Sequence, residues 1–179
     1  MSDLAKTLLF IFCFLVAVNA ARAQNVAEPG DDAQILKVIS IIDQNESKIA
    51  DLAQGKNIDP VVLHYAKLIQ IDHQMNLDWD KELTRYLGSA PPQDSALITH
   101  WRNLGQDILI KLAPLDKDDF SREFIWELIR GYSNALVWIY SQNPQDKQIK
   151  MFLEDTKQRL ALHLKRAQQL REEVLDNPG

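Results

Sequence analysis

The chain has 179 residues, of which 46% are hydrophobic, and its 25 acidic residues outnumber its 20 basic ones to give a formal net charge of −5. An acidic chain has no overall electrostatic attraction for nucleic acid, so we expect no nucleic-acid partner. Because the sequence has only six glycines and one cysteine, we expect neither a glycine-rich phosphate loop nor a disulfide framework.

Residues 1–23 have the pattern of an export signal peptide. Lys6 supplies a positive charge, residues 8–18 are apolar, and Ala21-Arg22-Ala23 fits the small-residue cleavage rule. The apolar run is too short to span a bilayer, although an uncleaved membrane anchor is the alternative. We therefore predict that the mature chain begins at Gln24.

The predicted mature chain has about 155 residues, which is enough for one domain with a sizeable core. Two basic residues and one acidic residue leave with the signal, so the net charge becomes −6. Cys13 leaves as well, which excludes disulfides, cysteine nucleophiles and thiolate metal sites. We expect an exported protein, periplasmic or secreted and not integral to the membrane, with a flexible leader (24–30) and a single helical domain (31–176).

Apolar residues recur at helical spacing, and Gly, Pro, Asp and Ser punctuate the pattern. The second helix is the clearest, because Asp59 is a good N-cap, Pro60 suits the first helical position and Gly88 suits a C-terminal cap. The pattern predicts helices over residues 33–54, 60–87, 97–112, 119–142 and 144–176. Four long helices and one short one, joined by short turns, predict an all-α, up-and-down helical bundle.

Each long helix has one polar residue near the middle of its apolar stripe. These residues are Glu46, His73, Tyr132 and His163. In an antiparallel bundle of helices of similar length the midpoints lie at the same height, so the four side chains could form one layer. Asp72 would flank this layer, and because adjacent helical residues point about 100° apart it would serve His163 or a neighbouring helix rather than His73.

Two interpretations of this layer stay open. In the first, Glu46, His73 and His163 bind one transition metal ion (Zn, Cu, Fe or Mn), with Asp72 and Tyr132 as further ligands or hydrogen-bond partners. In the second, the layer is a buried polar network in which Glu46 accepts hydrogen bonds from both imidazoles and from the tyrosine hydroxyl. The paired Glu-x-x-His motifs of di-iron bundles do not occur in the sequence, so a di-iron centre is not expected.

The last predicted helix is basic in an otherwise acidic chain. Between Lys147 and Arg171 seven basic residues stand against two acidic ones. One interpretation is a solvated face, and the other is a surface for a partner protein or anionic lipid headgroups formed by Lys150, Lys157, Lys165 and Arg166.

Several segments resemble a large bacterial family of exported, ferritin-like helical bundles of unknown function, often labelled outer-membrane proteins. Residues 65–73, Tyr-Ala-Lys-Leu-Ile-Gln-Ile-Asp-His, resemble its Phe-Ala…Asp-His signature, and Glu46 matches an acidic position of its first helix. Residues 120–124 are similar to its Phe-Asp-Arg-x-Tyr segment, and 160–164 with Ala167 to its Leu-x-x-His-Leu…Ala motif. Tyr132 stands where the family usually has histidine, and Lys157-Gln158 replaces Leu-Pro.

The resemblance covers most of the mature chain and implies an all-α, ferritin-like antiparallel four-helix bundle with one additional short helix. It also implies a cluster of histidines and acids that could bind metal. We expect an exported, non-enzymatic binding protein with a metal or small-ligand site in the central polar layer. The alternatives are an interaction module that uses the basic last helix and a metal-dependent redox enzyme.

Overall fold

The computed structural model describes residues 31–88 and 95–176, and all regular secondary structure in these ranges is helical. The helices are α2 (Asp32–Gln54), α3 (Pro60–Leu87), α4 (Ala96–Leu112), α5 (Lys117–Tyr140), α6 (Lys147–Leu170) and a short π-helix, η1 (Arg171–Asp176). The predicted all-α class is confirmed. The predicted signal peptide (1–23) and leader (24–30) lie outside the described residues. None of the described helices is both long enough and apolar enough to cross a membrane.

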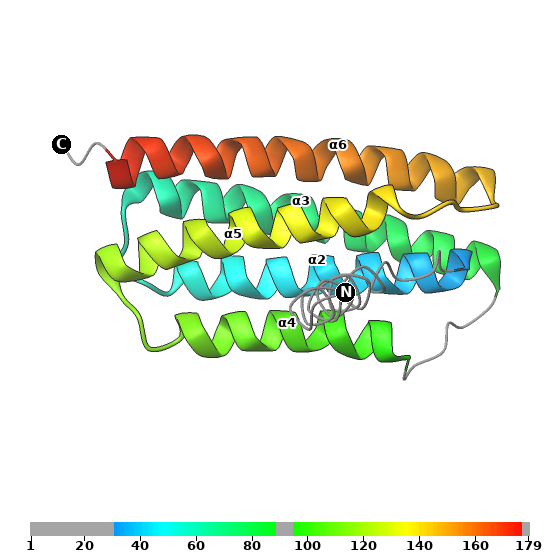
Figure 1. The fold of residues 1–179 in the computed structure, drawn as a ribbon, viewed down its shortest axis with the longest axis horizontal. Coiled ribbons are helices and arrows are strands. Elements are labelled where there is room, and N and C mark those ends of the chain that lie inside the picture. The colour runs from blue at the N-terminus through cyan, green and yellow to red at the C-terminus, as the bar shows by residue number, and fades with distance from the viewer. Residues whose placement is uncertain (1–30, 89–94, 177–179) are drawn as a thin grey trace, which may run out of the picture.

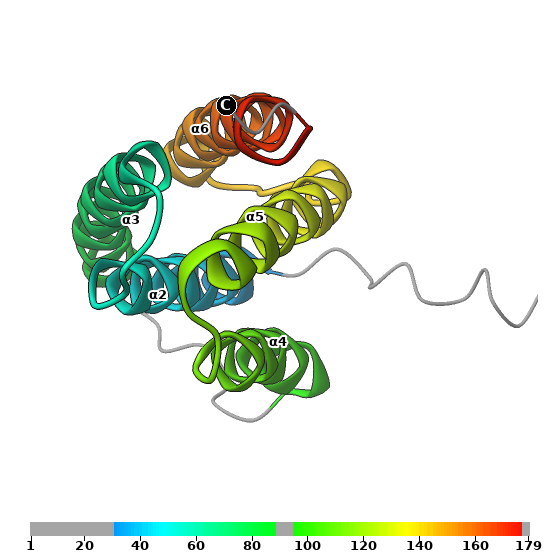
Figure 2. The ribbon, with the colours of Figure 1, turned by 90° about the vertical axis from the view of Figure 1, so that its left-hand side faces the viewer.

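The helices alternate in direction along the chain, as the colour order in Figure 1 shows. In the end-on view α2, α3, α5 and α6 surround a common interior, and α4 lies outside this group against α2 and α5 (Figure 2). Helices α2 and α5 connect the parts of the bundle, because α2 contacts α3, α4 and α5, and α5 also contacts α4 and α6.

The helix ends follow from local sequence chemistry. The Asp59 carboxylate accepts a hydrogen bond from the backbone N–H of Val61 at 2.7 Å, and Gly88 ends α3 in the left-handed region at φ 64°. Both predicted caps of this helix are confirmed. Because glycine lacks a Cβ, it adopts this conformation without the steric cost that other residues meet.

Two helix starts differ from the prediction by more than one residue. The last helix begins at Lys147 and not at residue 144, because the Asp146 carboxylate accepts from the backbone N–H of Gln148 at 2.6 Å and so sets the N-cap there. Helix α5 begins at Lys117, two residues before the predicted start, and ends at Tyr140.

Long-range hydrogen bonds fix both ends of the bundle. The Asp32 carboxylate at the start of α2 accepts from the backbone N–H groups of Gln145 and Asp146, at 2.9 and 2.8 Å, just before α6. The Asp116 carboxylate, just before α5, accepts from the backbone N–H of Asn57 in the turn after α2, at 3.2 Å. These contacts hold α2, α5 and α6 in fixed axial positions, so that their midpoints face one another.

Candidate functional site

Three of the four predicted layer residues form a stack of rings in the interior. The ring centroids of Tyr132 and His163 lie 5.4 Å apart with an interplanar angle of 20°, and those of His73 and His163 lie 5.5 Å apart at 23°. All three side chains are buried, and Glu46 is buried beside them. The structure thus brings together the polar residues that interrupt α2, α3, α5 and α6.

Asp43 on α2 is the partner of His73. Its Oδ1 atom lies 2.6 Å from His73 Nδ1, and its Oδ2 atom accepts from Asn76 Nδ2 at 2.6 Å. Burial lowers the pKa of His73, but the hydrogen bond and charge of Asp43, together with the nearby charges of Glu46 and Asp72, raise the pKa above its ordinary value. The expectation that Glu46 accepts from His73 is therefore wrong, because the nearby Asp43 takes that position.

His163 has a different environment, which keeps its ring neutral. Its Nε2 atom lies 3.3 Å from a carboxylate oxygen of half-exposed Asp72, as predicted, and the Tyr65 hydroxyl lies 3.5 Å from its Nδ1 atom. That hydroxyl donates to the backbone carbonyl of His163 at 2.7 Å. Burial and the nearby charge of His73 lower the pKa of His163 to about 4.

Glu46 is the least satisfied member of the layer. Its Oε2 atom is fully buried and has no hydrogen-bond partner of normal geometry, although the Tyr132 hydroxyl is close enough to affect the carboxyl group. Burial is the main reason that the pKa of Glu46 rises to about 7, and the charge of His73 opposes this rise. Gly131 on α5 makes room for the carboxyl, since a Cβ there would lie 3.0 Å from Glu46 Oε1.

The metal interpretation gains no support from this geometry. Within residues 31–88 and 95–176, no group of three or more His, Cys, Asp or Glu side chains could hold a metal ion. The His73 and His163 ring centroids lie 5.5 Å apart at an interplanar angle of 23°, and Nδ1 of His73 is already paired with Asp43. A metal site that includes Glu46, with Asp72 and Tyr132 as further ligands, stays a prediction from the sequence.

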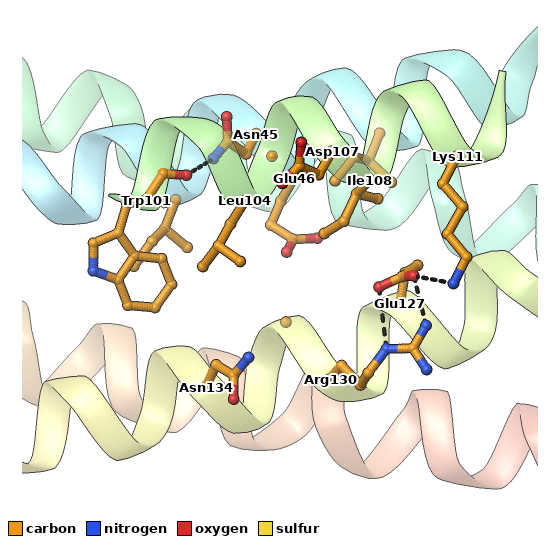
Figure 3. Close-up of a pocket in the computed structure, with 14 residues that line it drawn as sticks. Asn45, Glu46, Trp101, Leu104, Asp107, Ile108, Lys111, Glu127, Arg130 and Asn134 are labelled. Carbon is orange, nitrogen blue, oxygen red and sulfur yellow. Dashed lines mark hydrogen bonds and ion pairs between the residues drawn. The ribbon is translucent and has the colours of Figure 1, made fainter. Parts of the chain in front are cut away.

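A cavity of about 260 Å³ opens between α2, α4 and α5 on the Glu46 side of the layer. Figure 3 shows Trp101 at one end and the side chains of Lys111, Glu127 and Arg130 at the other, with Glu46 between them and pointing toward α5. The apolar residues of the wall come from α2 and α4 and are Ile42, Ile49, Trp101, Leu104 and Ile108.

The cations at the mouth of the cavity are already paired. Glu127 accepts from Lys111 at 2.8 Å and also pairs with Arg130. Glu123 pairs with the same two cations, at 2.8 Å from the guanidinium. Asp107 is an exposed acid that lines the same cavity. The two positive and two negative groups of this network balance, so they add little net charge to the mouth.

Helix α4 approaches α2 closely at the back of the cavity. The Asn45 side-chain amide on α2 donates to the backbone carbonyl of Trp101 at 2.9 Å. A Cβ at Gly105 would lie only 2.1 Å from an atom of the Asn45 side chain. The absence of a side chain at Gly105 therefore allows the contact that places α4 over the cavity.

Sequence reasoning missed Asp43 and the charged network at the mouth. Asp43 lies one helical turn before Glu46, so its spacing was a usable signal that a second acid shares the core face of α2. Glu127 and Arg130 stand three residues apart, which is the spacing of an intrahelical ion pair. Nothing in the pattern indicates that Lys111, on another helix, joins them.

The structure places part of the basic surface of the last helix in ion pairs. Lys157 and Arg166 each pair with a nearby glutamate, at 2.7 and 3.0 Å. Lys150 and Lys165 are exposed on α6. The positive charge that this face presents is therefore smaller than the count of basic residues implies.

Comparison with known proteins identifies the family but not an activity. A family model described as "Domain of unknown function (DUF4142)" matches residues 17–170, a range that includes the ring stack and the cavity. Searches of the curated proteins and of the solved structures each find no significant match. Because the family model matches most of its 179 residues, the chain belongs to the DUF4142 family of domains of unknown function.

Proposed function

We propose that this protein is an exported, non-enzymatic binding protein whose small organic ligand occupies the cavity beside Glu46. We further propose that its four central helices form a ferritin-like bundle to which α4 is the addition. The observation that carries the binding proposal is a cavity of about 260 Å³ that contains a buried carboxyl group whose Oε2 atom has no hydrogen-bond partner. Apolar walls with a few convergent polar groups are typical of small-ligand sites.

The cavity is suited in size to a small ligand. An apolar cavity of about 150 Å³ can hold a benzene molecule. The larger volume found here accommodates an aromatic ring with a short side chain. The charged side chains at the mouth pair with one another, so the ligand contacts the walls formed by α2 and α4. These paired residues are Lys111, Glu123, Glu127 and Arg130.

The ring stack provides a rigid support behind the cavity. Tyr132 is fully buried and follows Gly131, the residue that makes room for the Glu46 carboxyl. His73 and His163 are themselves fixed by hydrogen bonds or ion pairs to neighbouring side chains. A site whose polar group is already held in place loses less conformational freedom when a ligand binds.

Three probes with the same ring test the binding proposal: 2-phenylethylamine, 2-phenylethanol and phenylacetate. Each is titrated into the wild-type protein and into Leu104→Trp, which fills the cavity, by isothermal calorimetry. Leu162→Trp is the matched control, because Leu162 is 67% exposed on α6. At least one probe should bind the wild type and Leu162→Trp equally and bind Leu104→Trp about tenfold more weakly or not at all.

Thermal unfolding of both variants establishes that they are folded before binding is compared. Equal binding to the wild type and to Leu104→Trp would refute the cavity as the site. Absence of binding by all three probes would refute the proposed function. Export is tested separately by N-terminal sequencing of the protein recovered outside the cytoplasm, which should begin at Gln24; a mature chain that retains residues 1–23 would refute it.

A further inference from the structure

Glu46 is a buried polar residue of the cavity wall that lies between its Trp101 end and its charged end. The other polar group on the α2 wall, the Asn45 amide, already donates to the Trp101 carbonyl at 2.9 Å. Glu46 Oε2 is buried and has no such partner, and the Glu46 side chain both lines the cavity and interacts with His73 and Tyr132 of the ring stack. A ligand that donates a hydrogen bond here would satisfy a buried acceptor, which is worth more than an equivalent bond at the surface.

The charges around the cavity disfavour an anionic ligand. Lys111 and Arg130 both pair with Glu123 and Glu127, so a ligand carboxylate would have to displace an existing ion pair at the mouth. Beyond the mouth it would meet Glu46, another acid. The site therefore favours a neutral or positively charged ligand.

A positively charged ligand gains more at Glu46 than a neutral one. Most buried ion pairs are opposed by the loss of hydration of both partners. Folding has already removed water from Glu46, which is 6% exposed, so an incoming ammonium group loses only its own hydration. The Tyr132 hydroxyl lies close enough to the carboxyl to favour its charged form.

We propose that the ligand is a small primary amine with an apolar body, whose ammonium group pairs with the Glu46 carboxylate while the body lies between α4 and α5; this inference rests on the proposed function. The five apolar residues of the wall contact the body of the ligand. Glu46 is thus the residue that determines specificity, and the cavity walls set the size of the ligand.

Calorimetry with the same probes at a mildly alkaline pH tests this inference. The wild-type protein should bind 2-phenylethylamine about tenfold more tightly than 2-phenylethanol, because the ammonium group is charged and pairs with the carboxylate, whereas the hydroxyl is neutral. Phenylacetate should bind more weakly than either. Glu46→Gln should remove the preference for the amine, because it weakens binding of the amine more than binding of the alcohol.

Asp107→Asn is the matched control, because it removes an exposed acid from the same cavity and should leave the preference for the amine intact. If the amine and the alcohol bind equally to the wild type, while Leu104→Trp weakens both, the ammonium inference is refuted and the proposed function stands. The inference is also refuted if Asp107→Asn loses the preference for the amine over the alcohol while Glu46→Gln keeps it. If no probe binds, both are refuted.

Discussion

Replacing Glu46 with glutamine should change the way in which stability depends on pH. Glu46 has an ordinary pKa of 4.5, which represents the unfolded chain, and burial raises the pKa in the folded protein to about 7. Between these values the folded protein holds a proton that the unfolded chain has released. The free energy of unfolding therefore falls as the pH rises through this window, by about 3 kcal/mol in total, and is constant above it.

Glutamine has nearly the same shape and does not ionise, so Glu46→Gln should not show this loss. Relative to the wild type, the variant should be about 3 kcal/mol more stable at a pH near 8 than at a pH near 4. Urea unfolding at both pH values measures the difference, provided that the m-values agree. Asp80, whose pKa burial also raises to about 7, is present in both proteins, so its contribution cancels in the comparison.

The charged groups that face Glu46 are Asp43 on α2, His73 on α3 and Glu127 on α5, and each influences its pKa. The pH-dependent difference in unfolding free energy between the variant and the wild type therefore reflects the titration of the whole cluster and not of an isolated carboxyl group. Glu154→Gln, a change at an exposed position on α6, should show no such dependence on pH. If the stability profiles of the wild type and Glu46→Gln run parallel between the two pH values, Glu46 is not a buried acid with a raised pKa.

Three further predictions concern single positions. In an NMR titration the ring of His163 should stay neutral down to a pH of about 5 and that of His73 should titrate above its ordinary value; the opposite order would contradict the assigned environments. Asp43→Ala should lower the free energy of unfolding by about 3 kcal/mol, because it leaves a buried imidazole without its partner, and a loss below about 1 kcal/mol in urea unfolding would contradict this. Gly105→Ala should cost about 1–3 kcal/mol in the same assay, because its Cβ would lie 2.1 Å from a side chain of α2. Gly55→Ala, whose Cβ would lie 3.6 Å from its nearest neighbour, is the control, and equal effects would refute the argument.

The helices were predictable where their ends depend on adjacent residues. Asp59, Pro60 and Gly88 act within one turn of the backbone that they cap, so the sequence shows their effect directly. The start of α6 was misplaced because Pro144 breaks the pattern, whereas the side chain that caps the helix belongs to Asp146. Whether the helix starts at Pro144 or after Asp146 depends on the path of the loop that follows α5.

The sequence predicts the level along the bundle at which the polar residues of the site lie, but it does not predict which of them pair with one another. Helix lengths place the midpoints together, and this was enough to group His73, Tyr132 and His163. Asp43 and Glu46 lie one turn apart on the same face of α2, so only the packing of α2 against α3 decides which acid meets His73. The cavity was not predictable, since it depends on the position of α4 across α2 and α5 and the sequence pattern does not indicate helix neighbours.

Gly105 on α4 and Gly131 on α5 both face α2, and they restrict the axial positions at which α4 and α5 can pack against it. Asn45 and Glu46 are consecutive residues, and each meets a glycine of a different helix. If α4 slid by one turn along α2, about 5.4 Å, Trp101 or Leu109 would replace Gly105 opposite Asn45. A similar slide of α5 would bring Glu127 or Ala135 against the Glu46 carboxyl. Each glycine therefore allows one axial register of its helix, and larger residues sterically exclude the neighbouring registers. A uniform apolar stripe cannot provide this specificity, because it packs similarly in each register.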